Sequence, residues 1–162
     1  MGRITVRCSN RGVRKIAFGA GLKSPKPRNG YSAAQGAVLA ANGQRTKAAK
    51  WARQAKKELT AYASGRRKKF TVPLDLAGTA FQKKVWKALL AIPYGETRSY
   101  GEIARQVGNP KAARAVGMAN HQNPVAIVVP CHRVIASDGR LGGYAAGLQR
   151  KSDILEIEKG HA

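Results

Sequence analysis

Cysteine is scarce in this sequence: its 162 residues include only two, Cys8 and Cys131. So few cysteines exclude a disulfide-rich scaffold, and without a recognisable secretory segment they favour free thiols in a reducing cytosol. Long apolar runs are also missing, because no stretch approaches the roughly eighteen residues that span a bilayer. We therefore expect a cytoplasmic protein without a membrane segment.

Acidic residues are scarce as well: eight Asp and Glu stand against thirty Lys and Arg, which gives a formal net charge of +22. The imbalance is concentrated in residues 1–70, where eighteen of the cations accompany a single acid, Glu58. Such a charge attracts polyanions, nucleic acid first, through the release of counterions. The alternative is a basic surface that is merely solvated.

The N-terminal part of the chain predicts a small α/β domain. Apolar residues alternate on both sides of the turn signal at residues 10–12, which indicates a β-hairpin with Cys8 in the core. Residues 19–45 are rich in Gly, Pro, Asn and Ser and are expected to form a loop. Thr46 can cap a helix over residues 47–63. The side of that helix opposite its apolar stripe is basic, with Lys50, Arg53, Lys56 and Lys57.

A boundary between two domains is expected near residue 75, which gives domains 1–75 and 76–162. Residues 70–72 predict a short strand and residues 73–78 a linker, at the point where the charge density falls. Capping boxes at residues 79–82 and 99–102 predict two helices, the second ending at Gly108.

A third helix is predicted over residues 110–119, with Asn109 as its cap and Pro110 in its first position. The short turn before it suggests a helix-turn-helix. Its small residues permit close approach to a DNA groove, with Arg114 as the one long side chain in mid-helix, although small residues also serve tight packing within a protein.

The stretch from Asn123 to Val134 contains the chemistry. Residues 125–129 are apolar and mostly β-branched, which predicts a buried strand that Pro130 ends, presenting Cys131 beside His132. A lone pair of this kind is more often a buried structural thiol with a satisfied histidine. The last helix, predicted over residues 148–159, carries Glu158 on the apolar side that Leu148, Ile154 and Leu155 mark. A buried carboxylate needs a partner, and His132 is the expected one.

Several motifs between residues 74 and 158 resemble those of the O6-alkylguanine-DNA alkyltransferases. The most specific is Pro130-Cys131-His132-Arg133-Val134 after Asn123-Pro124 and an apolar run. Others are residues 79–86, 92–100 and 109–117 and the Gly143-Tyr144 loop. The resemblance implies an α+β fold: a small N-terminal α/β domain with a β-sheet, then a mostly helical domain with a winged-helix-like helix-turn-helix. It also implies a monomer that acts on double-stranded DNA without a cofactor.

The implied reaction is irreversible transfer of an alkyl group from guanine O6 to Cys131 after the base has been flipped out. The catalytic residues by resemblance are Cys131, His132 acting through a water, Glu158, Asn123 and Tyr100. Asn123 is expected to fix Tyr100 and Cys131, and Arg133 to anchor the segment. The substrate-binding residues would be Val134, Tyr144, Ala145 and Ala146, and the DNA-binding residues Lys111, Ala112, Ala113, Arg114 and Gly117.

Two departures from the family are visible. Some members carry zinc in the N-terminal domain, but Cys8 is the lone candidate ligand there, so no metal is expected. Many members have Tyr-Ser-Gly-Gly in the pocket loop, whereas this chain has Tyr144-Ala145-Ala146-Gly147. Ala145 lacks a hydroxyl for O6, and the methyl group of Ala146 narrows the space.

Two other functions compete with this interpretation. One is a DNA-binding module that recognises alkylated bases without transferring the group, against which the presence of Cys131, His132 and Glu158 together argues. The other is a cysteine hydrolase that uses Cys131, His132 and Asn123. Adjacent Cys and His suit a protease dyad poorly, and a charge of +22 has no role there.

Overall fold

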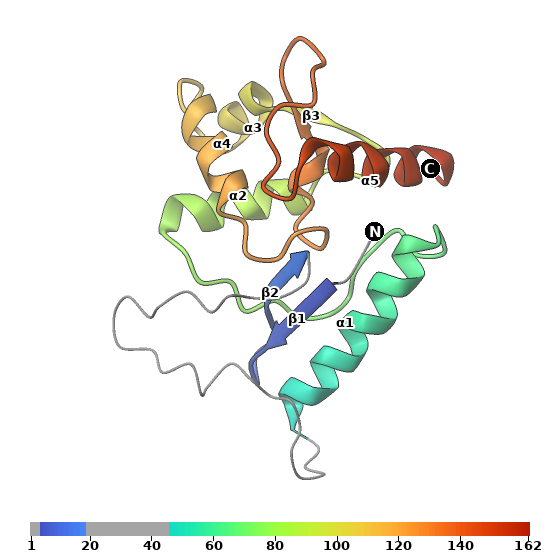
Figure 1. Cartoon of the computed structure of the whole chain (residues 1–162). Helices are drawn as coiled ribbons and strands as arrows, with labels where there is room; N and C mark the ends of the chain where they lie inside the picture. The colour runs from blue at the N-terminus through green and yellow to red at the C-terminus, as the bar shows by residue number, and fades with distance from the viewer. Residues whose placement is uncertain (1–3, 19–45) are drawn as a thin grey trace.

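The computed structural model describes residues 4–18 and 46–162, which form an α+β structure with one continuous apolar core. The strands β1 (Ile4–Cys8) and β2 (Val13–Phe18) pair antiparallel, and α1 (Lys47–Ala63) packs against them (Figure 1). The hairpin and the helix capped by Thr46 are thereby confirmed. Cys8 is half-buried against the core. The loop expected over residues 19–45 lies outside the described residues.

The strand predicted at residues 70–72 is wrong. The backbone N–H groups of Thr71 and Val72 donate to the Glu58 carboxylate at 2.9 and 3.3 Å, so a side chain takes the place of a neighbouring strand. The chain then pairs with β2 at a single bridge, where Val13 donates to Pro73 and accepts from Asp75. This bridge fixes the segment in which the domain boundary was expected, and that division stays a prediction.

The helices α2 (Ala80–Leu90), α3 (Tyr100–Gln106) and α4 (Ala113–His121) lie at the end of the molecule away from α1 (Figure 1). Both predicted capping boxes are formed. The apolar side chain of Leu90, at the end of α2, is 46% exposed. The indole of Trp86 donates to the Ala119 carbonyl at 2.9 Å, which ties α2 to the helix-turn-helix that α3 and α4 form.

Helix α4 begins three residues later than predicted. The N–H of Ala112 donates to the Asn109 carbonyl, so Asn109–Ala112 close a separate turn, and no side chain caps α4. Lys111 and Ala112 therefore precede the helix, while Ala113, Arg114 and Gly117 belong to it.

Residues 125–129 are buried as expected, apart from half-buried Ala126, but they form a turn and not a strand. The N–H of Val129 returns to the Val125 carbonyl at 3.0 Å, and Ile127 adopts a positive φ of 72°. Cys131 consequently begins a 3-10 helix, Cys131–Arg133. That helix leads into β4 (Val134–Ile135), which pairs parallel with β3 (Arg98–Ser99).

The last helix, α5, runs from Leu148 to Gly160, close to its predicted bounds. Its buried residues include Ile154, Leu155 and Glu158 as expected. The prediction that Leu148 faces the core is wrong, because this residue is 52% exposed. The buried side of α5 instead includes Lys151. Within the described part of the chain, no helix is long and apolar enough to cross a membrane.

Candidate active site

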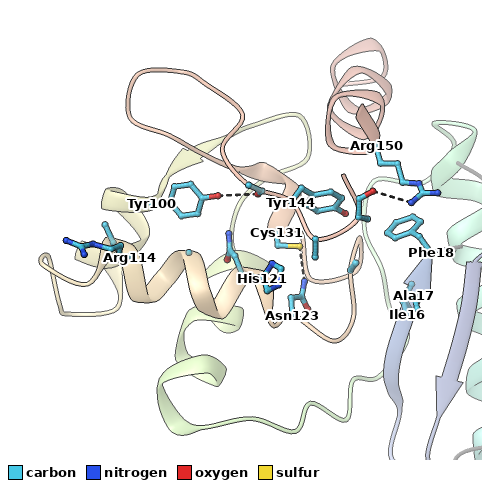
Figure 2. A pocket seen from close by; sticks show the side chains of 17 residues that line it. Ile16, Ala17, Phe18, Tyr100, Arg114, His121, Asn123, Cys131, Tyr144 and Arg150 are labelled. Carbon is cyan, nitrogen blue, oxygen red and sulfur yellow. Dashed lines mark hydrogen bonds between the residues drawn. The ribbon is translucent and has the colours of Figure 1, made fainter. Parts of the chain in front are cut away.

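A cavity of about 820 Å³ lies between the helix-turn-helix and the first hairpin (Figure 2). Tyr100 and Arg114 flank one end and Phe18 and Arg150 the other, with Cys131 between them. Most of the predicted site residues line this cavity: Tyr100, Ala113, Arg114, Gly117, Asn123, Cys131, Tyr144, Ala145 and Ala146. Lys111, Ala112, Val134, His132 and Glu158 are not among its lining residues.

Cys131 is 6% exposed at the cavity wall, and Asn123 holds it there. The Asn123 amide nitrogen lies 3.1 Å from the Cys131 sulfur and 2.8 Å from the Val129 carbonyl, while its oxygen accepts from the N–H of Val125. One side chain therefore closes the 125–129 turn and positions the thiol. Burial raises the pKa of Cys131, and the Asn123 hydrogen bond offsets this in part.

His132 and Glu158 lie behind the cavity wall, both fully buried. The His132 Nε2 atom is 3.0 Å from Glu158 Oε1, as the sequence predicted. Arg133 forms a fork on the same carboxylate, with Nη2 at 2.7 Å from Oε1 and Nε at 2.9 Å from Oε2, and it also donates to the Ile92 carbonyl. Burial alone would raise the pKa of Glu158, but the hydrogen bonds from His132 and Arg133 hold it at about 2.

These contacts define which nitrogen of His132 carries the proton. An ionised carboxylate only accepts hydrogen bonds, so the network assigns the N–H to Nε2 and leaves a lone pair on Nδ1. Nδ1 is buried and has no hydrogen-bond partner among the described residues. Burial lowers the pKa of His132, which keeps the imidazole neutral at physiological pH. His132 can therefore act as a base through Nδ1.

The loop after β4 forms the other wall of the cavity. The Tyr100 hydroxyl donates to the Gly143 carbonyl at 3.5 Å, and no hydrogen bond joins Tyr100 to Asn123 in the described chain, contrary to expectation. Gly142 has a φ of 65°, and a Cβ atom there would lie 3.0 Å from the Tyr100 ring. The Tyr144 side chain points into the same cavity (Figure 2).

Sequence reasoning missed two side chains at this site. Lys151 is fully buried, and its ammonium donates to the Val134 carbonyl at 2.5 Å and to the Leu141 carbonyl, which fastens the loop to β4. Burial lowers the pKa of Lys151 to about 8. The hydroxyl of Tyr62 on α1 donates to Glu158 Oε1, a contact that the sequence does not predict. Helical periodicity marks both positions as buried but does not show what their polar atoms meet.

Taken together, the fold and the cavity define a class of protein: a helix-turn-helix protein whose buried cysteine opens on a cavity and is backed by a histidine–carboxylate pair. A family model described as the DNA-binding domain of 6-O-methylguanine DNA methyltransferase matches residues 80–160. The chain belongs to this family, as its motifs indicated.

Relatives and solved structures agree with that assignment. A methylated-DNA–protein-cysteine methyltransferase of Mycobacterium tuberculosis is 63% identical over 105 residues, which are 65% of this chain and 64% of that protein. One from Methanosarcina acetivorans is 59% identical over 106 residues, 65% of this chain and 68% of the relative. The match thus spans less than two thirds of the mycobacterial protein.

The likeness in structure extends over nearly the whole chain. The crystal structure of Mycobacterium tuberculosis OGT in complex with DNA superimposes with a TM-score of 0.75 at 42% identity, covering 98% of this chain and 88% of that one. It supports the α+β class, while the winged-helix detail stays a prediction.

Proposed function

We propose that the protein repairs DNA by direct reversal, moving an alkyl group from guanine O6 in duplex DNA to Cys131 in a single turnover. The observation that carries the proposal is the position of Cys131 at the cavity wall, followed in the chain by His132, which is hydrogen-bonded to Glu158. The named activity of the relatives and the DNA in the mycobacterial structure support it. In this proposal the protein acts as a monomer in the cytoplasm, associated with DNA.

The chemical step begins with a protonated thiol, because burial raises the pKa of Cys131. The thiol proton passes, through a water, to the lone pair on His132 Nδ1, and Glu158 stabilises the resulting imidazolium. The thiolate sulfur then forms a bond to the alkyl carbon as the bond from that carbon to O6 breaks. The electron pair stays on guanine, which takes a proton from the Tyr100 hydroxyl and leaves as the neutral base.

Access to O6 requires the nucleotide to leave the base stack, at a cost of about a few kcal/mol. In the proposal α4 lies along the DNA groove, with Ala113 and Gly117 allowing close approach, Arg114 filling the gap in the stack, and Lys111 near the backbone. The exposed side chain of Arg114, at the cavity end beside Tyr100, supports this arrangement (Figure 2). Backbone groups of Val134 and Ala145 would hold the base edge and Tyr144 would wall the pocket, with Ala146 beside it.

Intact-mass measurement after incubation with O6-methylguanine duplex tests the proposal. We expect one methyl group per chain in wild type, none in Cys131→Ala, and one in Cys8→Ser, which removes the other thiol as a matched control. Cys131→Ala should still bind the duplex, because it loses no phosphate contact. Methyl transfer that survives in Cys131→Ala would refute the mechanism.

One observation favours a second function, recognition of alkylated bases without transfer. Because burial raises the pKa of Cys131, the resting thiol is a poor nucleophile. A wild-type protein that binds methylated duplex tightly but gains no mass would identify such a module. Repeated turnover with product release would instead indicate the hydrolase.

A further inference from the structure

Tyr62 brings a phenol from α1 into the centre of the site. The side chain is fully buried, and its hydroxyl lies 2.5 Å from Glu158 Oε1 and 3.3 Å from His132 Nε2. The ring is held by Phe70, with centroids 5.2 Å apart, and by an edge-to-face contact with Tyr94 at 5.9 Å. Tyr62 precedes the segment that the family model matches.

The direction of the hydrogen bond follows from its partner. Glu158 is ionised and can only accept, so the phenol O–H donates to Oε1. The distance of 2.5 Å lies in the range of charge-assisted O–H···O⁻ bonds, which are about twice as strong as neutral ones. Burial and the adjacent carboxylate raise the pKa of Tyr62, so it remains a donor throughout the physiological range.

Besides Tyr62, three groups bind the Glu158 carboxylate: His132, Arg133 and the backbone N–H of Gly95, which donates to Oε2 at 3.2 Å. Arg133 presents a fork that reaches both oxygens, while His132 reaches only Oε1. A guanidinium fork satisfies both oxygens of a carboxylate without any third group. The phenol is a further donor to Oε1, beside the imidazole, and it holds that oxygen within hydrogen-bonding distance of Nε2.

We propose that Tyr62 is a positioning residue for alkyl transfer: by donating to Glu158 Oε1 it keeps the carboxylate on His132 Nε2, so that the lone pair on Nδ1 stays available to the thiol. The inference rests on the proposed function. It gives α1 a role in the reaction, although every group that the proposed mechanism places against the alkylated base comes from elsewhere in the chain.

Tyr94 offers a matched control within the same aromatic cluster. Its ring packs against Tyr62, but its hydroxyl donates to the Ile157 carbonyl at 3.4 Å and makes no hydrogen bond to Glu158. Tyr62→Phe and Tyr94→Phe each remove one phenolic oxygen and retain the ring. A purely structural role for the hydroxyl predicts similar effects from the two variants.

The test compares single-turnover methyl transfer at saturating duplex. Tyr62→Phe should slow transfer at least about tenfold, the value of one hydrogen bond to a charged group, and Tyr94→Phe by less than about twofold. Both should bind duplex like wild type. In a Glu158→Gln background, Tyr62→Phe should cause no further loss, because its effect passes through that carboxylate. Equal losses in the two phenylalanine variants, or full additivity with Glu158→Gln, would overturn the proposal.

A measurement on the wild-type protein keeps the proposal testable if Tyr62→Phe fails to fold. The ¹⁵N shifts of the His132 ring should report the proton on Nε2, and a far-downfield proton should mark the short bond from Tyr62 to Glu158. A ring with its proton on Nδ1 would overturn the proposal even if transfer is normal. If the wild-type protein gains no methyl group, the proposed function is contradicted. The NMR spectrum would then still decide whether Tyr62, Glu158 and His132 form the proposed hydrogen bonds.

Discussion

The molecule buries two glutamates, Glu58 and Glu158, one in each half of the chain, and their main hydrogen-bond partners differ. Glu58, on α1, is 3% exposed and accepts from the backbone N–H groups of Thr71 and Val72, the Thr71 hydroxyl and Gln54, while a guanidinium nitrogen of Arg67 lies 3.6 Å from Oε1. Glu158, on α5, is fully buried and is bound mainly by side chains, among them two that ionise, His132 and Arg133. Burial of a carboxylate alone therefore does not indicate function.

The difference lies in what each carboxylate holds in place. Glu58 fixes main chain, and its partners have nothing to exchange with a substrate. Glu158 fixes His132, the proposed base, which follows the Cys131 thiol directly in the chain. In both cases burial alone would raise the pKa, and hydrogen bonds lower it, to about 2 for Glu158. A lowered pKa marks a satisfied carboxylate in either half, whereas the titratable partner marks the site.

Replacing each glutamate by glutamine should produce the largest difference in transfer rate between a substitution in one half of the chain and one in the other. Glu158→Gln should slow single-turnover transfer about a hundredfold or more, because the imidazolium loses its counter-charge. It should also cost about 3–5 kcal/mol of stability, since the Arg133 charge stays buried without a partner. Glu58→Gln should cost about 1–3 kcal/mol and leave the rate per folded molecule unchanged. Single-turnover rates and urea unfolding of the two variants check these expectations. A Glu58→Gln variant with slow transfer would contradict the contrast between the two glutamates.

Substitutions of basic side chains in the two halves should also have different effects on the transfer rate. Arg114→Ala should slow transfer from duplex at least about tenfold, because flipping costs a few kcal/mol, but not transfer from the free alkylated base. Neutralising the exposed basic face of α1, at Lys50, Arg53, Lys56 and Lys57, should leave the saturated rate unchanged, because α1 lies away from α3 and α4 (Figure 1).

The salt dependence of binding to a short duplex measures that contrast directly. For the wild type, with roughly four to six phosphates neutralised, log affinity should fall against log salt with a slope of about −4 to −5. Removing Lys111, which lies near the DNA backbone in the proposal, should reduce the slope by about one, and the four α1 substitutions together by less than that. A large change from α1 would mean that its basic face contacts DNA after all.

Low pH should destabilise the protein because both buried glutamates become protonated, and protonation of Glu158 should contribute more than that of Glu58. Its folded pKa of about 2 lies below the ordinary 4.5, so its contribution is complete above pH 4.5 and is lost as the pH falls towards 2. The lowered pKa of His132 acts in the same direction, with stability lost as the pH falls below 6.5. Urea midpoints between pH 7 and pH 3 should fall less steeply in Glu158→Gln than in Glu58→Gln. Equal slopes would contradict this order.

Much of this arrangement could be predicted from the sequence, and the errors have physical causes. The capping boxes at Thr79 and Ser99 are local, so the helices they begin were placed correctly. The predicted strand at residues 125–129 is a turn because the Asn123 side chain binds both its ends, which an apolar pattern does not show. Tyr62 could not be linked to the site, because its contact with Glu158 joins residues 96 positions apart.

The smallest expected effect concerns the methyl groups of two residues that line the cavity, Ala146 in the loop after β4 and Ala17 on β2. The Ala146 carbonyl accepts from Arg150 at 3.2 Å, and the Arg150 guanidinium lies 5.5 Å from the Phe18 ring, which draws the loop towards β2. A benzyl adduct needs more room than a methyl adduct, so Ala146→Gly should raise the benzyl-to-methyl rate ratio roughly threefold, the value of about one methyl group. It also frees the backbone of the loop, which acts in the same direction.

Ala17→Gly removes an equal volume from a hydrogen-bonded strand and should leave the ratio unchanged. Single-turnover rates for both adducts decide the matter: a ratio that does not rise in Ala146→Gly would show that this methyl group does not limit the pocket, and a rise in both variants would mean that cavity volume alone matters.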